Sequence, residues 1–220
     1  MGEDRETVPT LIDVHSHPLF PVWKAALASA TGQSIESVSM FGLKMPAWSP
    51  ELHIQAMDTN AIDLSSLSLP GATNFLTGRN ARTLARAINE ELANIVDCHS
   101  PRFGTFAVTP LDDMDAAIEE MVYALDVLKL DGVVSSTHHL DKYLGDGHFD
   151  PWFDEMTRRR TTLFVHPLPP ANFKLAATLD VRVAVTHQDN RESSACPIRW
   201  SGDFSFGFSK LNNEISEGRS

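Results

Sequence analysis

Two histidines one residue apart, His15 and His17, stand in the segment LIDVHSHPLF at residues 11–20. A third histidine, His166, stands near the end of the segment TTLFVHP at residues 161–167. Neutral imidazole nitrogens bind zinc at about 2.0–2.1 Å, and three protein ligands with one open coordination position are typical of catalytic zinc. The sequence therefore predicts a metal site made by these three histidines, provided that the fold brings them together.

The spacing of the first two histidines suits one face of a β-strand. Side chains alternate between the faces of a strand, so Asp13, His15 and His17 would share one face and Ile12 and Val14 the other. We expect Asp13 to be a catalytic residue that accepts a hydrogen bond from a ring or touches the metal, unless it only caps the polar end of the strand. The alternative for each histidine is an ordinary hydrogen-bonded structural role.

Four other side chains are candidates for the same site. His187, in AVTHQD, ends another possible strand and could act as an acid or a further ligand. His138 follows a predicted strand and could line the pocket, whereas Trp48 could form an aromatic wall. Arg102 could hold a substrate carboxylate through a bidentate fork. The alternatives are a solvated loop histidine, a core tryptophan and a surface arginine, and His53 is expected at the surface of a helix.

Strand and helix patterns alternate along the first 170 residues. Strands are predicted at residues 10–15, 61–70, 103–110, 131–137 and 161–167, and helices at 49–60, 80–98, 111–130 and 149–160, while 16–48 is expected to be irregular. Ser49 and Asp150 are the candidate N-caps of the first and last of these helices.

This alternation indicates βα units and a parallel sheet, either closed into a barrel or opened into a doubly wound sheet. No GxGxxG or P-loop follows a predicted strand, which argues against a nucleotide-binding open sheet. In a parallel barrel the carboxyl ends of all strands open onto one face, and that face carries the active site. His15, His17 and His166 would then converge there.

The part of the chain after residue 170 lacks this alternation. It offers one possible strand near 180–186, followed by a stretch with few aliphatic residues and many Ser, Gly and Asn. We therefore expect residues 1–170 to be the N-terminal portion of a barrel and residues 171–220 to be a divergent, loop-rich or disordered tail.

The composition excludes several classes of protein. The chain has 220 residues, 42% hydrophobic and 21% charged, with a net charge of −11. It shows no basic stripe, so we expect no nucleic-acid partner and no anionic membrane surface as partner. Two cysteines without CxxC spacing indicate neither a disulfide framework nor a cysteine zinc site. The polar start MGEDRETVPT and the lack of an apolar run of about 18 residues favour a cytoplasmic protein.

The chain resembles the amidohydrolase-related metal-dependent decarboxylases. This family includes aminocarboxymuconate-semialdehyde decarboxylase, γ-resorcylate decarboxylase and fungal 6-methylsalicylate decarboxylase. The resemblance covers about residues 9–170 and rests on the order and spacing of LIDVHSHPLFP, MPAWSPELHIQAMD, LSSLSLPG, PRFGTFAVTPLDDMDAAIEEMVYALD, DGVVSST, KYLGDGHFDPWFDE and FVHPLPP. The fungal branch is the most similar, through PAWSPELH and YLGD.

The resemblance implies a distorted (β/α)8 barrel of the TIM-barrel type with one zinc or manganese ion and no organic cofactor. His15, His17 and His166 match the family's metal ligands. The family also has a histidine at the end of strand six that assists proton transfer, a role for which His187 is the candidate. It further has an aspartate on the metal at the end of strand eight, and no aspartate of this chain stands in such a context. Because the family pattern stops soon after Pro170, we expect an incomplete barrel of about five to six βα units.

Three functions follow from this resemblance. The first is non-oxidative decarboxylation of a small aromatic or unsaturated carboxylic acid, with that carboxylate as the partner and a homo-oligomer as an open possibility. The second is metal-dependent hydrolysis, since the same ligands serve both reactions. The third is a non-catalytic, incomplete barrel.

Overall fold

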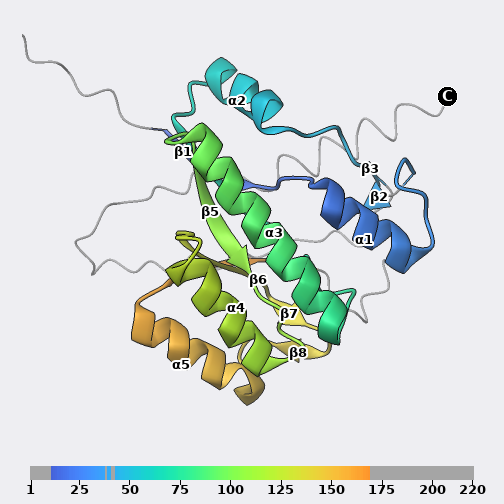
Figure 1. Cartoon of the computed structure of the whole chain (residues 1–220), viewed down its shortest axis with the longest axis vertical. Coiled ribbons are helices and arrows are strands. Elements are labelled where there is room, and N and C mark those ends of the chain that lie inside the picture. Colours follow the sequence, from blue (N-terminus) through green and yellow to red (C-terminus); the bar gives the residue numbers. More distant parts are fainter. Residues whose placement is uncertain (1–10, 38, 41–42, 169–220) are drawn as a thin grey trace, which may run out of the picture. The chain divides into compact units, whose positions relative to one another are not determined.

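The computed structural model describes residues 11–37, 39–40 and 43–168, all within the unit formed by residues 1–172 (Figure 1). The possible strand at 180–186, the candidate His187 and the tail expected over 171–220 lie outside the described residues. In the described part of the chain, no helix is both long and apolar enough to cross a membrane.

Five parallel strands form the central sheet. Their order is β1 (Ile12–Ser16), β4 (Leu64–Leu67), β5 (Phe103–Val108), β6 (Gly132–Ser136) and β9 (Thr162–His166). Every adjacent pair in this order is parallel, and a helix stands between consecutive strands along the chain. All five predicted strands are confirmed, as is the parallel βα arrangement.

The sheet is strongly curled. β1 and β9 stand at opposite ends of the strand order, and four steps of about 4.8 Å would separate them by about 19 Å in a flat sheet. Instead, the ring of His15 on β1 lies 5.5 Å from the ring of Phe164 and 5.0 Å from the ring of His166, both on β9. The five strands therefore form part of a barrel wall, with these rings on its inner face.

The helices cover the outer face of this wall. α3 (Gly78–His99) packs against β5 and α4 (Met114–Asp126), and α4 packs against α5 (Asp150–Arg159) (Figure 1). Ile88 and Leu92 of α3 are fully buried in the first core cluster, beside Phe103 and Ala107 of β5. A second core cluster joins α4, β6 and α5 through Met121, Val133 and Trp152. This packing fixes the strands relative to one another, and with them the strand ends that carry the histidines.

The helix starts agree with the predicted caps in one of two cases. α2 (Pro50–Thr59) begins after Ser49, whose hydroxyl accepts a hydrogen bond from the Leu52 backbone N–H at 3.2 Å. Asp150, predicted as an N-cap, is instead the first residue of α5, with Phe149 at the N-cap position. The reason is that the short 3-10 helix η1 (Gly147–Phe149) runs directly into α5.

Residues 16–48 are not wholly irregular, contrary to expectation. α1 (Pro21–Thr31) occupies PVWKAALASAT and ends at Gly32, which takes a left-handed conformation with φ of 68°. Pro21 stands in the first turn, where a proline costs no hydrogen bond, so it starts this helix and does not interrupt it. Two short hairpins complete the described elements: β2 (Ser39–Met40) with β3 (Leu43–Lys44), and β7 (His138–His139) with β8 (Lys142–Tyr143).

Candidate metal centre

Three histidines meet at the carboxyl ends of β1 and β9. His15 and His17 come from β1 and the residue that follows it, and His166 is the last residue of β9. The Nε2 atoms of His15 and His17 are 3.0 Å apart, and one ring nitrogen from each of the three histidines lies within 4.8 Å of the others. Within residues 11–37, 39–40 and 43–168, this is the one group of three or more potential metal-ligating side chains at such spacing.

The chemistry of this group fits a divalent metal ion. Tetrahedral nitrogen ligands at 2.0–2.1 Å from zinc lie about 3.3 Å from one another, which is inside the range of spacings in the cluster. His17 directs Nδ1 at the backbone carbonyl of Ser68, 2.9 Å away. A proton on that Nδ1 leaves the Nε2 lone pair toward the other two rings, as in sites where a second partner fixes the ligand tautomer.

The protonation of the three rings also suits metal binding. Burial lowers the pKa of His17, and burial together with neighbouring His17 lowers the pKa of His15. Burial and the two other imidazoles lower the pKa of His166 to about 4. The rings are therefore neutral near pH 7, the state in which imidazole binds a metal.

A β-bulge separates Asp13 from this cluster, so the expectation of one shared face is wrong. Asp13 stands beside Ser65 of β4 and Ser16 beside Leu67, which sets three steps of β1 against two of β4. The extra residue reverses the alternation, so Asp13 faces the outer layer while His15 faces Phe164 and His166.

Asp13 is a support of the strand end and not a member of the ligand group. Its Oδ1 accepts a hydrogen bond from the His15 backbone N–H at 2.9 Å. Its Oδ2 accepts hydrogen bonds from the Ser16 hydroxyl and, at 3.4 Å, from the Ser65 hydroxyl. These contacts do not support the catalytic role predicted for Asp13, which stays a prediction.

Trp48 and His53 are connected to Asp13 by hydrogen bonds through Ser65. The Trp48 indole N–H donates to His53 Nδ1 at 3.2 Å, and His53 Nε2 lies 3.1 Å from the Ser65 hydroxyl. Trp48 also packs edge to face on the fully buried Phe20, so it lies partly buried against the core. Its role as a wall of the pocket stays a prediction. The predicted position of His53 at the helix surface is therefore wrong, because nothing in the local sequence indicates that α2 turns this residue toward β4.

Arg102 lies at the end of the sheet opposite the histidines. It immediately precedes β5, where it donates to the Asp58 carboxylate at 2.8 Å and to the backbone carbonyls of Ile62 and Asp63 at 3.1 Å each. The histidines occupy the carboxyl ends of the strands, whereas this arginine joins their amino ends. This position does not support the predicted role of Arg102 in substrate binding, which stays a prediction.

His138 lies at the carboxyl ends of the strands, as the histidine cluster does. It is buried in β7, directly after Thr137, whose backbone N–H donates to the His166 carbonyl at 3.0 Å. Its own Nδ1 lies 3.4 Å from the Thr137 hydroxyl. A pocket-lining role for His138 stays a prediction.

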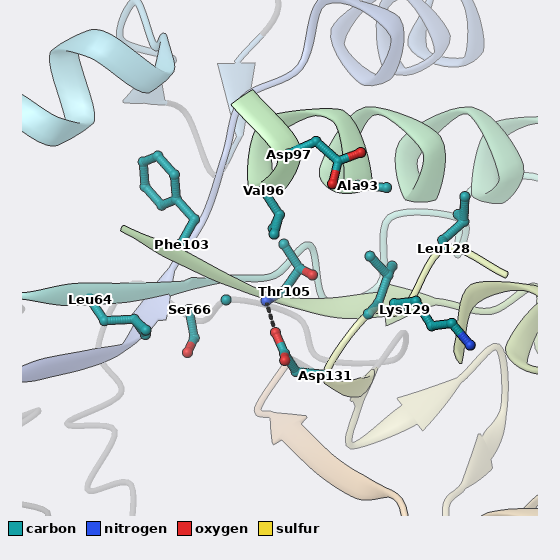
Figure 2. A pocket seen from close by; sticks show the side chains of 12 residues that line it. Leu64, Ser66, Ala93, Val96, Asp97, Phe103, Thr105, Leu128, Lys129 and Asp131 are labelled. Atoms are coloured by element: carbon teal, nitrogen blue, oxygen red, sulfur yellow. Dashed lines mark hydrogen bonds between the residues drawn. The ribbon is translucent and has the colours of Figure 1, made fainter. Parts of the chain in front are cut away.

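A cavity of about 290 Å³ lies elsewhere, at the amino ends of β4, β5 and β6. Figure 2 shows Thr105, Asp131 and Lys129 around it, with the Thr105 backbone N–H donating to the Asp131 carboxylate at 2.8 Å. The amino-terminal face of a parallel barrel is the face associated with stability. This cavity is therefore separate from the candidate metal centre.

Curated relatives cover the same part of the chain. The chain is 36% identical to the decarboxylase yanB of Aspergillus niger over 163 residues, which are 71% of this chain and 43% of that protein. It is 34% identical to the 6-methylsalicylic acid decarboxylase acuB of Aspergillus aculeatus over 169 residues, 74% of this chain and 49% of that protein. The chain thus spans less than half the length of these two relatives.

Solved structures share the fold. The crystal structure of 5-carboxyvanillate decarboxylase LigW from Sphingomonas paucimobilis matches with a TM-score of 0.62 and 25% identity, over 74% of this chain and 53% of that one. LigW2 from Novosphingobium aromaticivorans, a 5-carboxyvanillate decarboxylase solved with bound manganese, matches with a TM-score of 0.61 and 21% identity, over 73% of this chain and 51% of that one.

The match to a family model extends these similarities. The model Amidohydro_2, described as amidohydrolase, matches residues 12–195, which is most of the chain and continues past the resemblance seen over residues 9–170. Together with the curled parallel sheet, this match shows that the chain belongs to the Amidohydro_2 amidohydrolase family and has its TIM-barrel-like fold in part.

Proposed function

We propose that this chain carries the metal-binding part of a non-oxidative decarboxylase that acts on a small aromatic or unsaturated carboxylic acid. The observation that supports it most directly is the convergence of His15, His17 and His166 at the carboxyl ends of two strands. The names of the relatives, among them 6-methylsalicylic acid decarboxylases, supply the reaction class and the type of substrate. The proposal includes a zinc or manganese ion and no organic cofactor.

The described residues have distinct tasks in this reaction. The three histidines hold the ion, and Ser68 fixes the tautomer of His17 through its backbone carbonyl. The bound ion supplies Lewis-acid stabilisation and a template for the substrate carboxylate. His138 lines the pocket on the side of β6.

The proton transfer belongs to a residue outside the described part. We assign to His187 the delivery of a proton to the carbon that bears the carboxylate. The electron pair of the new carbon–hydrogen bond comes from the ring or double bond. The carbon–carbon bond then breaks, its electron pair restores that π system, and CO2 leaves. Residues 1–170 would form the N-terminal part of the barrel and 171–220 a divergent tail, in a cytoplasmic protein that works without nucleic acid or membrane.

CO2 release tests the proposal. We would express residues 1–220, load the chain with Zn²⁺ or Mn²⁺, and measure CO2 released from 6-methylsalicylate and related acids. Decarboxylation that disappears, together with the bound metal, in the His15→Ala/His17→Ala double variant would support it. Metal content unchanged in the double variant would show that these histidines are not the ligands.

The family name makes hydrolysis the second candidate, since Amidohydro_2 is described as an amidohydrolase family. Hydrolysis consumes one water molecule for each turnover and releases no CO2. Incorporation of ¹⁸O from labelled water into the product of an ester or lactone, without CO2 release from carboxylic acids, would favour the hydrolase. A metal-loaded chain with neither activity would favour a non-catalytic partial barrel.

A further inference from the structure

We propose that Trp48, His53, Ser65 and Asp13 form a hydrogen-bonded chain of positioning residues that sets the geometry of His15. The proposal rests on the metal centre proposed above and adds four residues that do not touch the ion. The chain runs from α2, across β4, to the bulge in β1. It acts on the cluster through the backbone of His15.

The chemistry of the donors gives this chain one direction. An indole N–H can only donate, so the nitrogen of His53 that faces Trp48, Nδ1, must accept and carries no proton. In the neutral ring the proton is then on Nε2, which donates to the Ser65 hydroxyl. Burial lowers the pKa of His53, in agreement with the neutral ring. The Ser65 hydroxyl is left to donate to the Asp13 carboxylate.

The carboxylate passes this constraint to the metal-binding segment. The bulge sets Val14 and His15 outside the regular pairing of β1 with β4. Asp13 Oδ1 accepts the His15 backbone N–H at 2.9 Å, and Oδ2 accepts the Ser16 hydroxyl. The Asp13 carboxylate, which accepts a hydrogen bond from Ser65, therefore fixes His15 and Ser16, the two residues that direct the His15 ring inward.

The surroundings of the chain strengthen its hydrogen bonds. Ser65 is fully buried, and the rings of Phe20 and Phe103 pack edge to face on Trp48 and His53. Hydrogen bonds in such a medium of low dielectric constant are stronger than in water and polarise one another along a network. Outer partners of metal ligands typically contribute ten- to a hundredfold to metal affinity.

A purely structural role, in which these bonds only attach α2 to the sheet, makes a different prediction. In that case, removal of these hydrogen bonds would lower thermal stability but would leave the metal-binding residues unchanged. The test therefore needs readouts at the cluster itself. Two are available: affinity for Co²⁺, measured by its visible absorption, and the hydrogen-exchange rate of the His15 backbone amide in the metal-free chain.

Two pairs of variants of residues 1–220 separate the roles. Ser65→Ala removes the middle of the chain, and its control is Ser66→Ala, the next residue of β4, which lines the cavity of Figure 2. Trp48→Phe removes the first donor and keeps a ring on Phe20. Its control is Trp23→Phe, since the buried indole N–H of Trp23 has no hydrogen-bond partner within the described residues.

We expect Ser65→Ala to weaken Co²⁺ binding about tenfold and Trp48→Phe less, with both controls within about twofold of the unchanged protein. Exchange of the His15 amide should accelerate roughly three- to tenfold in Ser65→Ala, as expected for the loss of one buried hydrogen bond, and should not change in Ser66→Ala. A lower melting temperature in Ser65→Ala with unchanged Co²⁺ affinity and unchanged His15 exchange would overturn the proposal.

The two proposals fail in distinguishable ways. If the unchanged protein binds no Co²⁺, the proposed metal centre is wrong. The exchange rate of the His15 amide then decides alone whether the four hydrogen-bonded residues position that segment. If Co²⁺ binds but no CO2 is released, the decarboxylase proposal fails while the comparison of Ser65→Ala with Ser66→Ala still decides the positioning role.

Discussion

Histidines in this chain take different roles because their surroundings differ. His15, His17 and His166 face one another across a curled sheet, whereas His53 lies between an indole and a serine. His139 is buried in β7, where its Nδ1 lies 2.9 Å from the Asn74 side-chain oxygen. In each of these positions burial lowers the pKa of the ring, although only the first three have nitrogens spaced for a metal.

The buried His139 gives a prediction about stability and pH. Burial holds its folded-state pKa below the unfolded value of 6.5. The unfolded chain therefore binds more protons below pH 6.5, and stability that is present above that pH is lost as the pH falls. Urea unfolding with a chelator present should show that His139→Asn loses less stability between pH 7 and pH 5 than the unchanged protein. The exposed His148→Asn is the matched control, and equal losses in all three proteins would contradict the prediction.

At the scale of elements, the bulge in β1 and the packing of α3 set the site. The bulge turns His15 inward and leaves Asp13 on the outer side, where α2 supplies His53 to support it. α3 covers the outer face of β5 and contacts α1 and α4 as well. The positions of the strand ends therefore depend on this helix.

Truncation in the α3 core should be costly. Leu92 is fully buried, and removal of its side chain beyond Cβ should lower the free energy of unfolding by about 2–5 kcal/mol, from lost burial and the cavity left behind. Leu52→Ala on α2 is the control, since Leu52 is 50% exposed and its loss should change stability by about 0.5 kcal/mol or less. Urea denaturation measures the free energy of unfolding of both variants. Similar decreases in the two variants would show that packing of α3 contributes little to the stability of the core.

On the scale of the whole molecule, the described sheet ends at two edge strands. β1 and β9 each pair with one neighbouring strand within the described residues. Ile12 on β1 is 50% exposed and Val165 on β9 is 42% exposed. Open edges with exposed aliphatic side chains promote association between sheets.

We therefore expect residues 1–220, expressed alone, to self-associate. Light scattering should give a mass above the 24.3 kDa of one chain, and Ile12→Lys should lower it, because a charge on an edge strand opposes pairing. Val22→Lys, on the exposed part of α1, is the control and should leave the mass unchanged. A single-chain mass for the unchanged protein would show that both edges are covered in solution.

Elements that depend on local pattern could be predicted from the amino-acid sequence. Alternation and helical spacing predicted the five strands of the parallel sheet and four of the five α-helices within the described residues, and histidines at strand ends predicted that three of these residues meet. α1 was missed although its signal was readable, since Pro21 stands where a proline starts a helix. The resemblance to decarboxylases of the amidohydrolase type also rested on sequence alone.

The positions of Asp13, His53 and Arg102 depend on contacts between segments that are distant in the sequence. The bulge depends on how β1 pairs with β4, and the paired residues Asp13 and Ser65 are 52 positions apart in the sequence. No local pattern in LIDVHSHPLF therefore predicts that Asp13 and His15 face opposite sides of the sheet. The direction in which α2 turns His53 depends on packing against β4 and Phe103. Arg102 resembles a carboxylate-binding residue in sequence, but the parallel sheet places it at the amino ends of the strands, opposite the histidines. Local sequence specifies which elements form, whereas pairing and packing between distant segments decide which side chains share a face.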